Sequence, residues 1–348
     1  MIHVGLVGYG LGGKVFHAPL IRLSPDLKLY AVCSRSAERR TQAKADYPHI
    51  VTVDDYGVLL ANPQIDLVVL ATPHDTHAPM AIQAMDAGKH VVTDKVMCLN
   101  EKEAQDMIAA SKRNNVLLSV FQNRRWDGDF LTIQKILQEG VLGDLSAIES
   151  NITAFGGPPG GWRAWKRYGG GRVRDWGAHL VDQALVLFGP TVRSVFADFQ
   201  YRYPADKADV ESTALIQLRF ENGVCFVMEL GSSWIYPKPR FHVRGSLGGF
   251  QKYGVDPQEA AMKLGTFGLP IPEDIARYHM RLRKSSGENS EISVTPVVGC
   301  YRTYYDNVGA ALSRHEELLV KPEFCLEAIR VIDAIFLASE RENVIHLS

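Results

Sequence analysis

Short apolar runs rich in β-branched residues alternate with longer amphipathic stretches over the first 121 positions. The apolar runs cover residues 2–7, 28–34, 65–71, 90–93 and 116–121. The intervening stretches have helical periodicity, most clearly at 37–45, 76–87 and 101–113. Asn100 followed by Glu103 is typical of a helix N-terminus, and Gly88 suits a helix C-terminus. Because unbroken apolar strands that alternate with helices indicate a parallel sheet covered on both faces, we predict a doubly wound α/β domain over residues 1–122.

After Phe121 the predicted strands lengthen and alternate apolar with polar positions. The runs 193–203, 212–220 and 224–234 follow one another without intervening helices. The last two are joined through Asn222-Gly223, a strong hairpin signal. Helices are expected near 127–139, 176–188, 301–313 and 322–341. We therefore expect residues 123–348 to form an α+β domain with a large, mainly antiparallel, open sheet.

Composition and charge exclude several classes of protein. The chain has 348 residues, a length typical of two domains, and 38 Lys and Arg against 39 Asp and Glu give a net charge of −1. No basic field is present to attract nucleic acid or an anionic membrane, and no apolar run approaches the ~20 residues of a membrane span. Five scattered cysteines without a CxxC pair favour reduced thiols and a cytoplasmic location.

A glycine-rich motif follows the first predicted strand directly. Gly8, Gly10 and Gly13 have the GxGxxG spacing and precede a helical stretch. In this context the first glycine permits a tight turn, the second lets the backbone approach a pyrophosphate, and the third allows close packing of helix on strand. The free N–H groups of the following helix favour phosphate binding. The motif predicts a dinucleotide site, the alternative being a turn without a ligand.

The end of the second strand bears on the choice of cofactor. NAD sites usually carry an acid here, which binds the ribose 2′-hydroxyl. This chain has Ser34 and Arg35 instead, followed by Arg39 and Arg40. A hydroxyl and a guanidinium suit a 2′-phosphate, so the pattern favours NADP, with NAD as the second candidate. A solvated loop is the plainer interpretation.

Two later strands also end in polar residues. Thr72, Pro73 and His77 follow the run 65–71, and Asp94 with Lys95 follows the run 90–93. Ligands of open α/β sheets bind at the carboxyl ends of the strands, so we expect all five residues at the cofactor. Lys95 could in addition contact a reacting hydroxyl, the alternative being a lysine in a solvated loop.

Asp175 and His179 are four positions apart, with Asp182 three positions further along, which predicts one helical face. A histidine beside a carboxylate is a candidate general base because its pKa lies near working pH. A metal site and a purely structural histidine are the alternatives. Without HExxH spacing or another clear ligand set, we predict no metal.

Together these segments resemble the glucose-fructose oxidoreductase/inositol dehydrogenase family (Gfo/Idh/MocA). The likeness covers nearly the whole chain, and its motifs are GLVGYGLGG, ATPHDTH, the DK pair and DWGAHLVDQ. Within the family, the segments FHAPLI, FQNRRWDGDF, DQALVLFG and KYGVDPQE look most like the NADP-dependent scyllo-inositol dehydrogenase branch.

The resemblance implies an NAD(P)-dependent dehydrogenase that transfers a hydride between nicotinamide and a secondary hydroxyl or ketone of a cyclitol or sugar. It implies His179 as catalytic acid/base, Lys95 as the group that polarises the hydroxyl, and Asp175 as their support. It also implies a homodimer or homotetramer formed through the second sheet. Substrate contacts are expected at Arg124, Trp126, Trp162, Arg163 and Asp182.

Other functions stay open at this point. They are another sugar or dihydrodiol dehydrogenase, a glycosidase that retains NAD, and a regulatory protein that senses NADP without turnover. The chain also departs twice from the family pattern. Val96 replaces the usual proline after Lys95, which would remove a rigid and sometimes cis peptide, and His74 replaces a common asparagine.

The segment from Trp162 to Arg174 carries five cations and no acid, with aromatic residues between them. One interpretation is a loop packed on the second domain. The other is a lid, hinged at Gly169–Gly171, that closes over the substrate and favours an anionic one.

Overall fold

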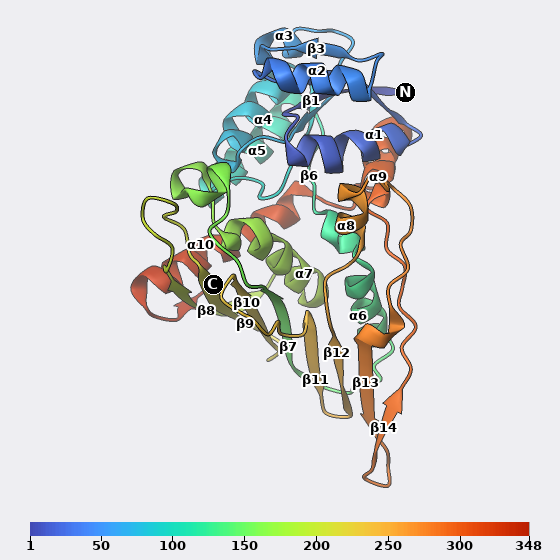
Figure 1. Cartoon of the computed structure of the whole chain (residues 1–348), viewed down its shortest axis with the longest axis vertical. Helices are drawn as coiled ribbons and strands as arrows, with labels where there is room; N and C mark the ends of the chain where they lie inside the picture. The colour runs from blue at the N-terminus through green and yellow to red at the C-terminus, as the bar shows by residue number, and fades with distance from the viewer. Residues whose placement is uncertain (348) are drawn as a thin grey trace. The chain divides into compact units, whose positions relative to one another are not determined.

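The computed structural model describes residues 1–347, which divide into two compact units (Figure 1). The first unit contains Met1–Asn123, Gln258–Pro270 and Cys300–Ile329, and the second contains the rest. The first unit is therefore not one continuous stretch, because two segments from the second half of the chain pack with residues 1–123. No helix within residues 1–347 has the length and apolar character needed to cross a membrane.

The first unit is built on a six-stranded parallel sheet in the order β3-β2-β1-β4-β5-β6. Its strands are β1 (Ile2–Val7), β2 (Leu27–Cys33), β3 (Val51–Val53), β4 (Leu67–Leu70), β5 (His90–Thr93) and β6 (Leu118–Val120). This order is that of a dinucleotide-binding Rossmann fold, which confirms the predicted class. The short strand β3 was not predicted.

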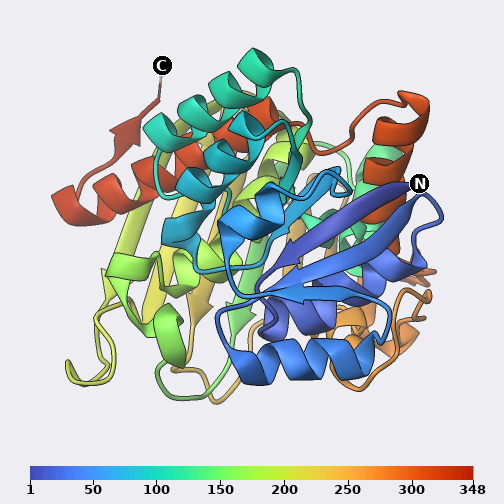
Figure 2. The same cartoon turned by 90° about the horizontal axis from the view of Figure 1, so that it is seen from above.

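Helices cover the parallel sheet on both sides. They are α1 (Ala18–Leu23), α2 (Ala37–Asp46), α3 (Tyr56–Leu60), α4 (His77–Asp86) and α5 (Glu101–Asn114), joined by α8 (Gln258–Lys263) and α9 (Arg302–Arg314) from the later segments. Figure 2 shows α4 and α5 on one side of the sheet and α1 and α2 on the other. The predicted cap is confirmed: the Asn100 side chain accepts from the Glu103 N–H at 2.9 Å.

The second unit is built on a nine-stranded sheet in the order β14-β13-β12-β11-β7-β10-β9-β8-β15. Its strands are β7 (Leu145–Thr153), β8 (Val192–Gln200), β9 (Thr213–Phe220), β10 (Cys225–Gly231), β11 (Phe241–Gly245), β12 (Gly248–Lys252), β13 (Tyr278–Arg283), β14 (Asn289–Ile292) and β15 (Ile345–His346). Only β7 and β10 pair in parallel, so the sheet is mainly antiparallel, as predicted. Asn222-Gly223 joins β9 to β10, with Gly223 at φ +85°.

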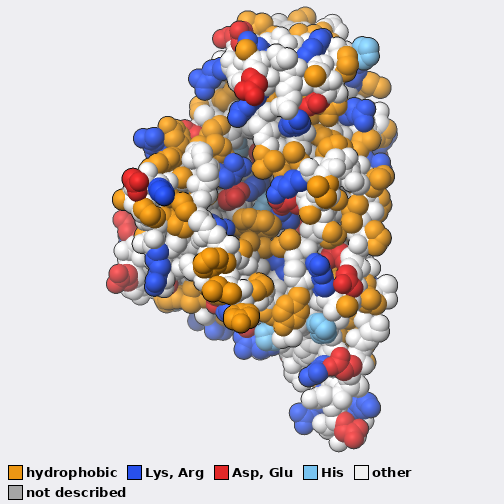
Figure 3. All heavy atoms as spheres, viewed as in Figure 1, with side chains coloured by type: hydrophobic (Ala, Val, Ile, Leu, Met, Phe, Trp, Pro, Cys, Tyr) orange, Lys and Arg blue, Asp and Glu red, His pale blue; other side chains and the backbone are white. Residues whose placement is uncertain are grey.

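The helices of this unit lie along one face of the sheet (Figures 1 and 2). They are α6 (Gly128–Gln138), α7 (Ala178–Phe188) and the later part of α10 (Pro322–Arg341), as predicted from the sequence. Buried positions alternate with exposed ones along β8 and β9, so the other face is open. At the tip of the β13–β14 hairpin, Arg283, Lys284 and Glu288 are exposed, and Figure 3 shows both charges there.

Candidate active site

The glycine loop after β1 is shaped by contacts that exclude side chains. Gly8 has φ +95°, and a Cβ on it would lie 2.3 Å from the Ala71 carbonyl oxygen. A Cβ on Gly13 would lie 2.0 Å from the carbonyl oxygen of Gly8. Gly10 is different, because the nearest atoms to its Cβ position belong to the Arg39 guanidinium, at 3.7–3.9 Å. The loop is thus tightly packed at Gly8 and Gly13, while Gly10 is open beside a cation.

The arginines after β2 have different surroundings. Arg40 donates from Nη1 to the carbonyl oxygens of Ser34 and Arg35, at 2.7 and 3.1 Å, and so holds the loop. Arg35 and Arg39 are exposed, and Arg39 reaches the glycine loop. Sequence reasoning did not assign Arg39 a role, although it lies one helical turn after Arg35. Two guanidinium groups and the Ser34 hydroxyl are a donor set that fits a phosphate.

The thiol at the end of β2 adds no negative charge to this donor set. Burial raises the pKa of Cys33 to about 11, helped by Asp55 and Asp54 and opposed by Arg40 and Arg35. The thiol is therefore neutral near pH 7.

Thr72, Pro73 and His77 lie at the carboxyl end of β4. Thr76 Oγ1 donates at 2.7 Å to Thr72 Oγ1 and lies 2.6 Å from the Pro73 carbonyl oxygen, which fixes this turn. His77 was expected at the cofactor, and the structure corrects this. Its side chain is 0% exposed, and its ring nitrogens lie 2.8 Å from the Val96 oxygen and 3.1 Å from the Thr72 oxygen.

Asp94 joins the end of β5 to the glycine loop. One carboxylate oxygen accepts from the Lys95 N–H at 2.8 Å, and the other lies 3.4 Å from His17 Nε2. A Cβ on Gly12 would lie 3.1 Å from that second oxygen. Burial raises the pKa of Asp94, but the contact with His17 and the charge of Lys95 outweigh it and hold the pKa well below its usual range. Asp94 is thus an anion beside Lys95.

The Lys95–Val96 peptide bond is cis. The expectation that valine in place of proline removes this geometry was wrong, because the valine peptide adopts it.

In the second unit, Asp175 and His179 occupy the start of one continuous helical segment. Asp175 is in a π-helical turn, Val173–Gly177, and His179 is in the first turn of α7. The Asp175 carboxylate lies 3.9 Å from Arg163 Nε, and the Arg163 guanidinium lies 4.5 Å from the Trp162 ring centre. His179 is 5% exposed and its ring centre is 6.2 Å from that of Trp176.

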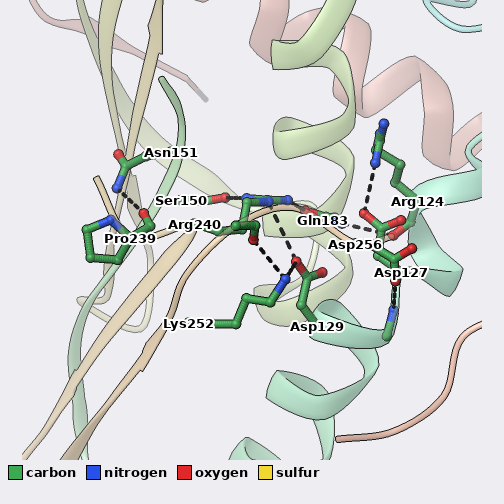
Figure 4. Close-up of polar contacts among 12 residues, drawn as sticks. Arg124, Asp127, Asp129, Ser150, Asn151, Gln183, Pro239, Arg240, Lys252 and Asp256 are labelled. Carbon is green, nitrogen blue, oxygen red and sulfur yellow. Dashed lines mark hydrogen bonds and ion pairs between the residues drawn. The ribbon is translucent and has the colours of Figure 1, made fainter. Parts of the chain in front are cut away.

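A buried polar network lies beneath α7 (Figure 4). Arg240 donates to Ser150 Oγ and, at 2.9 Å, to Gln183 Oε1. Gln183 donates in turn to the Arg124 carbonyl oxygen at 2.9 Å. The Arg124 guanidinium is 4.0 Å from the Trp176 ring centre. The network thus ties the helix that carries His179 to the sheet.

Asp182 was expected at the substrate, and the structure corrects this. It is 1% exposed and accepts two hydrogen bonds from the Arg125 guanidinium, at 2.8 and 2.7 Å. Arg124 is also buried, 5% exposed, with its guanidinium 3.3 Å from Asp127. Both side chains hold the segment that leads into α6 rather than facing outward.

The segment 162–174 is packed against its surroundings, which agrees with the first of the two interpretations and not with a hinge at Gly169–Gly171. Gly169–Gly171 are buried, and a Cβ on Gly170 would lie 2.4 Å from the Arg163 carbonyl oxygen. Gly171 N–H donates to that same oxygen at 3.0 Å. Trp165 packs with Tyr203 on a small core of Ala164, Ala208 and Val210.

Glu211 fixes the end of this loop. Its carboxylate is 1% exposed and accepts from the Val173 N–H at 2.8 Å, at the start of the turn that carries Asp175. Burial raises the pKa of Glu211, against the lowering effect of the Val173 hydrogen bond and of Arg174 and Lys166. Sequence reasoning missed this residue, because nothing in its neighbourhood indicates a partner 38 positions away.

The catalytic candidates belong to different units. Lys95 lies in the first unit, while Asp175 and His179 lie in the second. Among residues 1–347, no group of three or more His, Cys, Asp or Glu side chains is arranged to hold a metal ion.

Comparison with known proteins identifies the class. Residues 2–122 match the model of an oxidoreductase family with an NAD-binding Rossmann fold, and residues 130–251 match the Gfo/Idh/MocA C-terminal domain. The chain belongs to the Gfo/Idh/MocA family, and it is an NAD(P)-dependent oxidoreductase.

Relatives align over nearly the full length. The chain is 38% identical to the Escherichia coli oxidoreductase YdgJ, over 97% of this chain and 96% of that protein. It is 31% identical to IolW of Bacillus subtilis, a scyllo-inositol 2-dehydrogenase (NADP(+)), over 99% and 96%. The solved structure of the Bacillus subtilis oxidoreductase yvaA superimposes with a TM-score of 0.91 at 30% identity, covering 100% and 98%.

Proposed function

We propose that this protein is an NADP-preferring dehydrogenase acting on a secondary hydroxyl, or the corresponding ketone, of a cyclitol or sugar. The observation that carries the proposal is the end of β2, where Ser34 and the exposed Arg35 and Arg39 would donate to a 2′-phosphate on a loop that Arg40 holds. The NADP-dependent relative named above, matched over 99% of this chain, supports the same substrate class.

The residues that would hold the cofactor are spread over three loops of the first unit. Gly10 would let the backbone approach the pyrophosphate, while Gly8 and Gly13 would provide the tight turn and the close helix packing that shape the loop. Ser34 and Arg35, with Arg39, would bind the 2′-phosphate. Thr72, Pro73 and Asp94, together with Lys95, would line the remainder of the site at the strand ends.

When bound, the nicotinamide ring supplies the hydride acceptor or donor. His179 takes the hydroxyl proton in oxidation and returns it in reduction, because an imidazole can both accept and donate a proton. Lys95 donates a hydrogen bond to the same oxygen and stabilises its negative charge. Asp175 positions His179 and, with Trp126, Trp162 and Arg163, surrounds the substrate. No metal takes part in this scheme.

Arg35→Asp tests the cofactor assignment. A charge-assisted hydrogen bond contributes ~1.5–3 kcal/mol, or about ten- to a hundredfold in affinity. The variant should therefore lose at least tenfold in affinity for NADPH and little for NADH, because only NADPH carries the phosphate. Fluorescence titration of both reduced cofactors measures this.

Arg283→Asp is the matched control, because it makes the same charge change at an exposed hairpin tip. It should leave both affinities unchanged. Tighter binding of NADH than NADPH by the wild-type protein would refute the NADP preference.

The proposal extends to assembly and location. We propose that copies of the chain form a homodimer or homotetramer through the open face of the nine-stranded sheet, which α6 and α7 leave uncovered. A cytoplasmic location is supported by the five cysteines, none of which forms a disulfide within residues 1–347.

A further inference from the structure

Two histidines of the first unit, His17 and His77, are completely buried and have no part in the reaction proposed above. Both are 0% exposed. They come from different elements, His17 from the π-helical turn Gly12–His17 and His77 from the first residue of α4. Burying two imidazole rings costs free energy unless the ring nitrogens have polar partners. The partners of these nitrogens therefore indicate the role of each histidine.

His17 joins a tyrosine to Asp94. Its Nδ1 is 2.6 Å from the Tyr305 hydroxyl, and its Nε2 is 3.4 Å from the Asp94 carboxylate. In the tautomer with its proton on Nε2, Tyr305 donates to Nδ1, and Nε2–H faces the Asp94 carboxylate as an electrostatic contact without hydrogen-bond geometry. The ring also packs against Phe121, with ring centres 4.5 Å apart.

Tyr305 is itself held in place. It is 0% exposed, its ring meets that of Tyr304 edge-on at 5.2 Å, and its carbonyl oxygen accepts from the Ser24 hydroxyl at 3.2 Å. Burial raises the pKa of Tyr305 well above its usual value, so the hydroxyl keeps its proton. A continuous chain of buried contacts thus runs from α9 through His17 to Asp94.

His77 holds the other side of the same loop. Its Nδ1 is 2.8 Å from the carbonyl oxygen of Val96, the residue after Lys95, and its Nε2 is 3.1 Å from that of Thr72. Burial lowers the pKa of His77, against the raising effects of Asp94 and the two carbonyl groups. Both ring nitrogens face backbone carbonyl oxygens, so the ring bridges the Thr72 turn and the Val96 backbone whichever nitrogen carries the proton.

Lys95 thus lies between two residues that buried histidines hold. We infer that His17 and His77 are positioning residues for Lys95, His17 acting through the Asp94 carboxylate and His77 through the Val96 carbonyl. The inference rests on the proposed role of Lys95 at the substrate hydroxyl, because a lysine on a flexible stem acts precisely enough only when its backbone is fixed.

Replacing His17 with an amide residue tests its two contacts, with Tyr305 and with Asp94, one at a time. Glutamine places its amide nitrogen near the position of Nε2, and asparagine places its own near Nδ1. His17→Gln should therefore keep the contact with Asp94, whereas His17→Asn should keep only the contact with Tyr305. Tyr305→Phe removes one hydroxyl, leaves His17 present, and serves as a second variant if His17→Asn does not fold.

The measurement needs neither cofactor nor substrate. Lysines are dimethylated with ¹³C, and the NMR signal of Lys95 is assigned by its absence from Lys95→Arg. In His17→Asn this signal should move toward those of exposed lysines, with little change in His17→Gln and a smaller shift in the same direction in Tyr305→Phe. With NADP⁺ and a substrate, His17→Asn should also lose at least tenfold in kcat while its cofactor affinity stays within twofold.

An unchanged Lys95 signal in folded His17→Asn, or in Tyr305→Phe if that variant alone folds, would overturn the inference. Equal shifts in His17→Asn and His17→Gln would also overturn it, because Asp94 would then not be the connection. The proposed function fails on a different result, namely undiminished turnover by Lys95→Ala.

Discussion

His179→Ala is expected to slow hydride transfer by about 10²–10⁴-fold, the usual loss when a positioned general base is removed. Lys95→Ala should lose turnover on the same scale, because the oxyanion that forms at the substrate loses its cationic partner. Neither change alters the glycine loop or the arginines after β2. The groups proposed to bind the phosphates stay intact, so NADPH affinity should fall far less than turnover in both variants.

Single-turnover kinetics, started by mixing enzyme with cofactor and substrate, measures this step directly. Asp175→Asn should cost less, because the proposed role of Asp175 is to position His179. His49→Ala, which removes an exposed histidine of the first unit, should have no effect. If folded His179→Ala transfers hydride at the wild-type rate, the acid/base assignment is wrong.

Lys252→Ala is expected to destabilise the protein by about 3–5 kcal/mol, the cost of breaking a buried ion pair on one side. Lys252 is 0% exposed, and its ammonium lies 3.1 Å from Asp129, 2.7 Å from Glu273 and 2.8 Å from the Gly254 carbonyl oxygen. Figure 4 shows Lys252 and Arg240 on the same Asp129 carboxylate. Without the lysine, the Asp129 and Glu273 carboxylates stay buried with one positive charge fewer to compensate them.

Denaturant unfolding measures the loss of stability, and the dependence of this loss on pH tests its electrostatic cause. Burial already raises the pKa of Glu273, as does the charge of Asp129, against the effect of Lys252. Removing Lys252 raises this pKa further, so folding should take up protons and the variant should regain stability as the pH falls.

Lys135→Ala is the matched control on α6. Its ammonium lies 4.0 Å from Glu139 with both side chains at least half exposed, so the expected loss is about 0.5 kcal/mol or less. Equal losses in the two variants would mean that the buried network does not stabilise the fold.

The elements that the sequence predicted are those whose pattern is local. Strand β1 with its glycine loop, the Asn100 cap and the Asn222-Gly223 turn each have their signal within a few residues. Strand β7 was missed although it is central in its sheet, because Ser150 and Asn151 interrupt its apolar pattern. Both are buried, Asn151 donating at 2.9 Å to the Pro239 carbonyl oxygen and Ser150 accepting from Arg240.

The site was predicted less completely, because the partners of its polar residues are distant in the sequence. Residue type indicates that Asp182 and His77 are polar, but it does not show what they bind. The partner of Asp182, Arg125, is 57 positions away, and His77 reaches the Val96 carbonyl 19 positions away. Gly169–Gly171 suggested mobility, because a run of glycines occurs both in flexible loops and where a closely packed backbone leaves no room for side chains. The structure shows close packing at Gly170 and Gly171 and a left-handed backbone, φ +73°, at Gly169.

The proposed function is tested most directly by the rate of reduced-nicotinamide formation across a panel of cyclitols and sugars, each with NADP⁺ and with NAD⁺. We predict turnover of at least one cyclitol or sugar, with a higher kcat/KM for NADP⁺ than for NAD⁺. A panel without turnover, from protein that binds NADPH tightly, would contradict the dehydrogenase proposal and favour a protein that senses the cofactor.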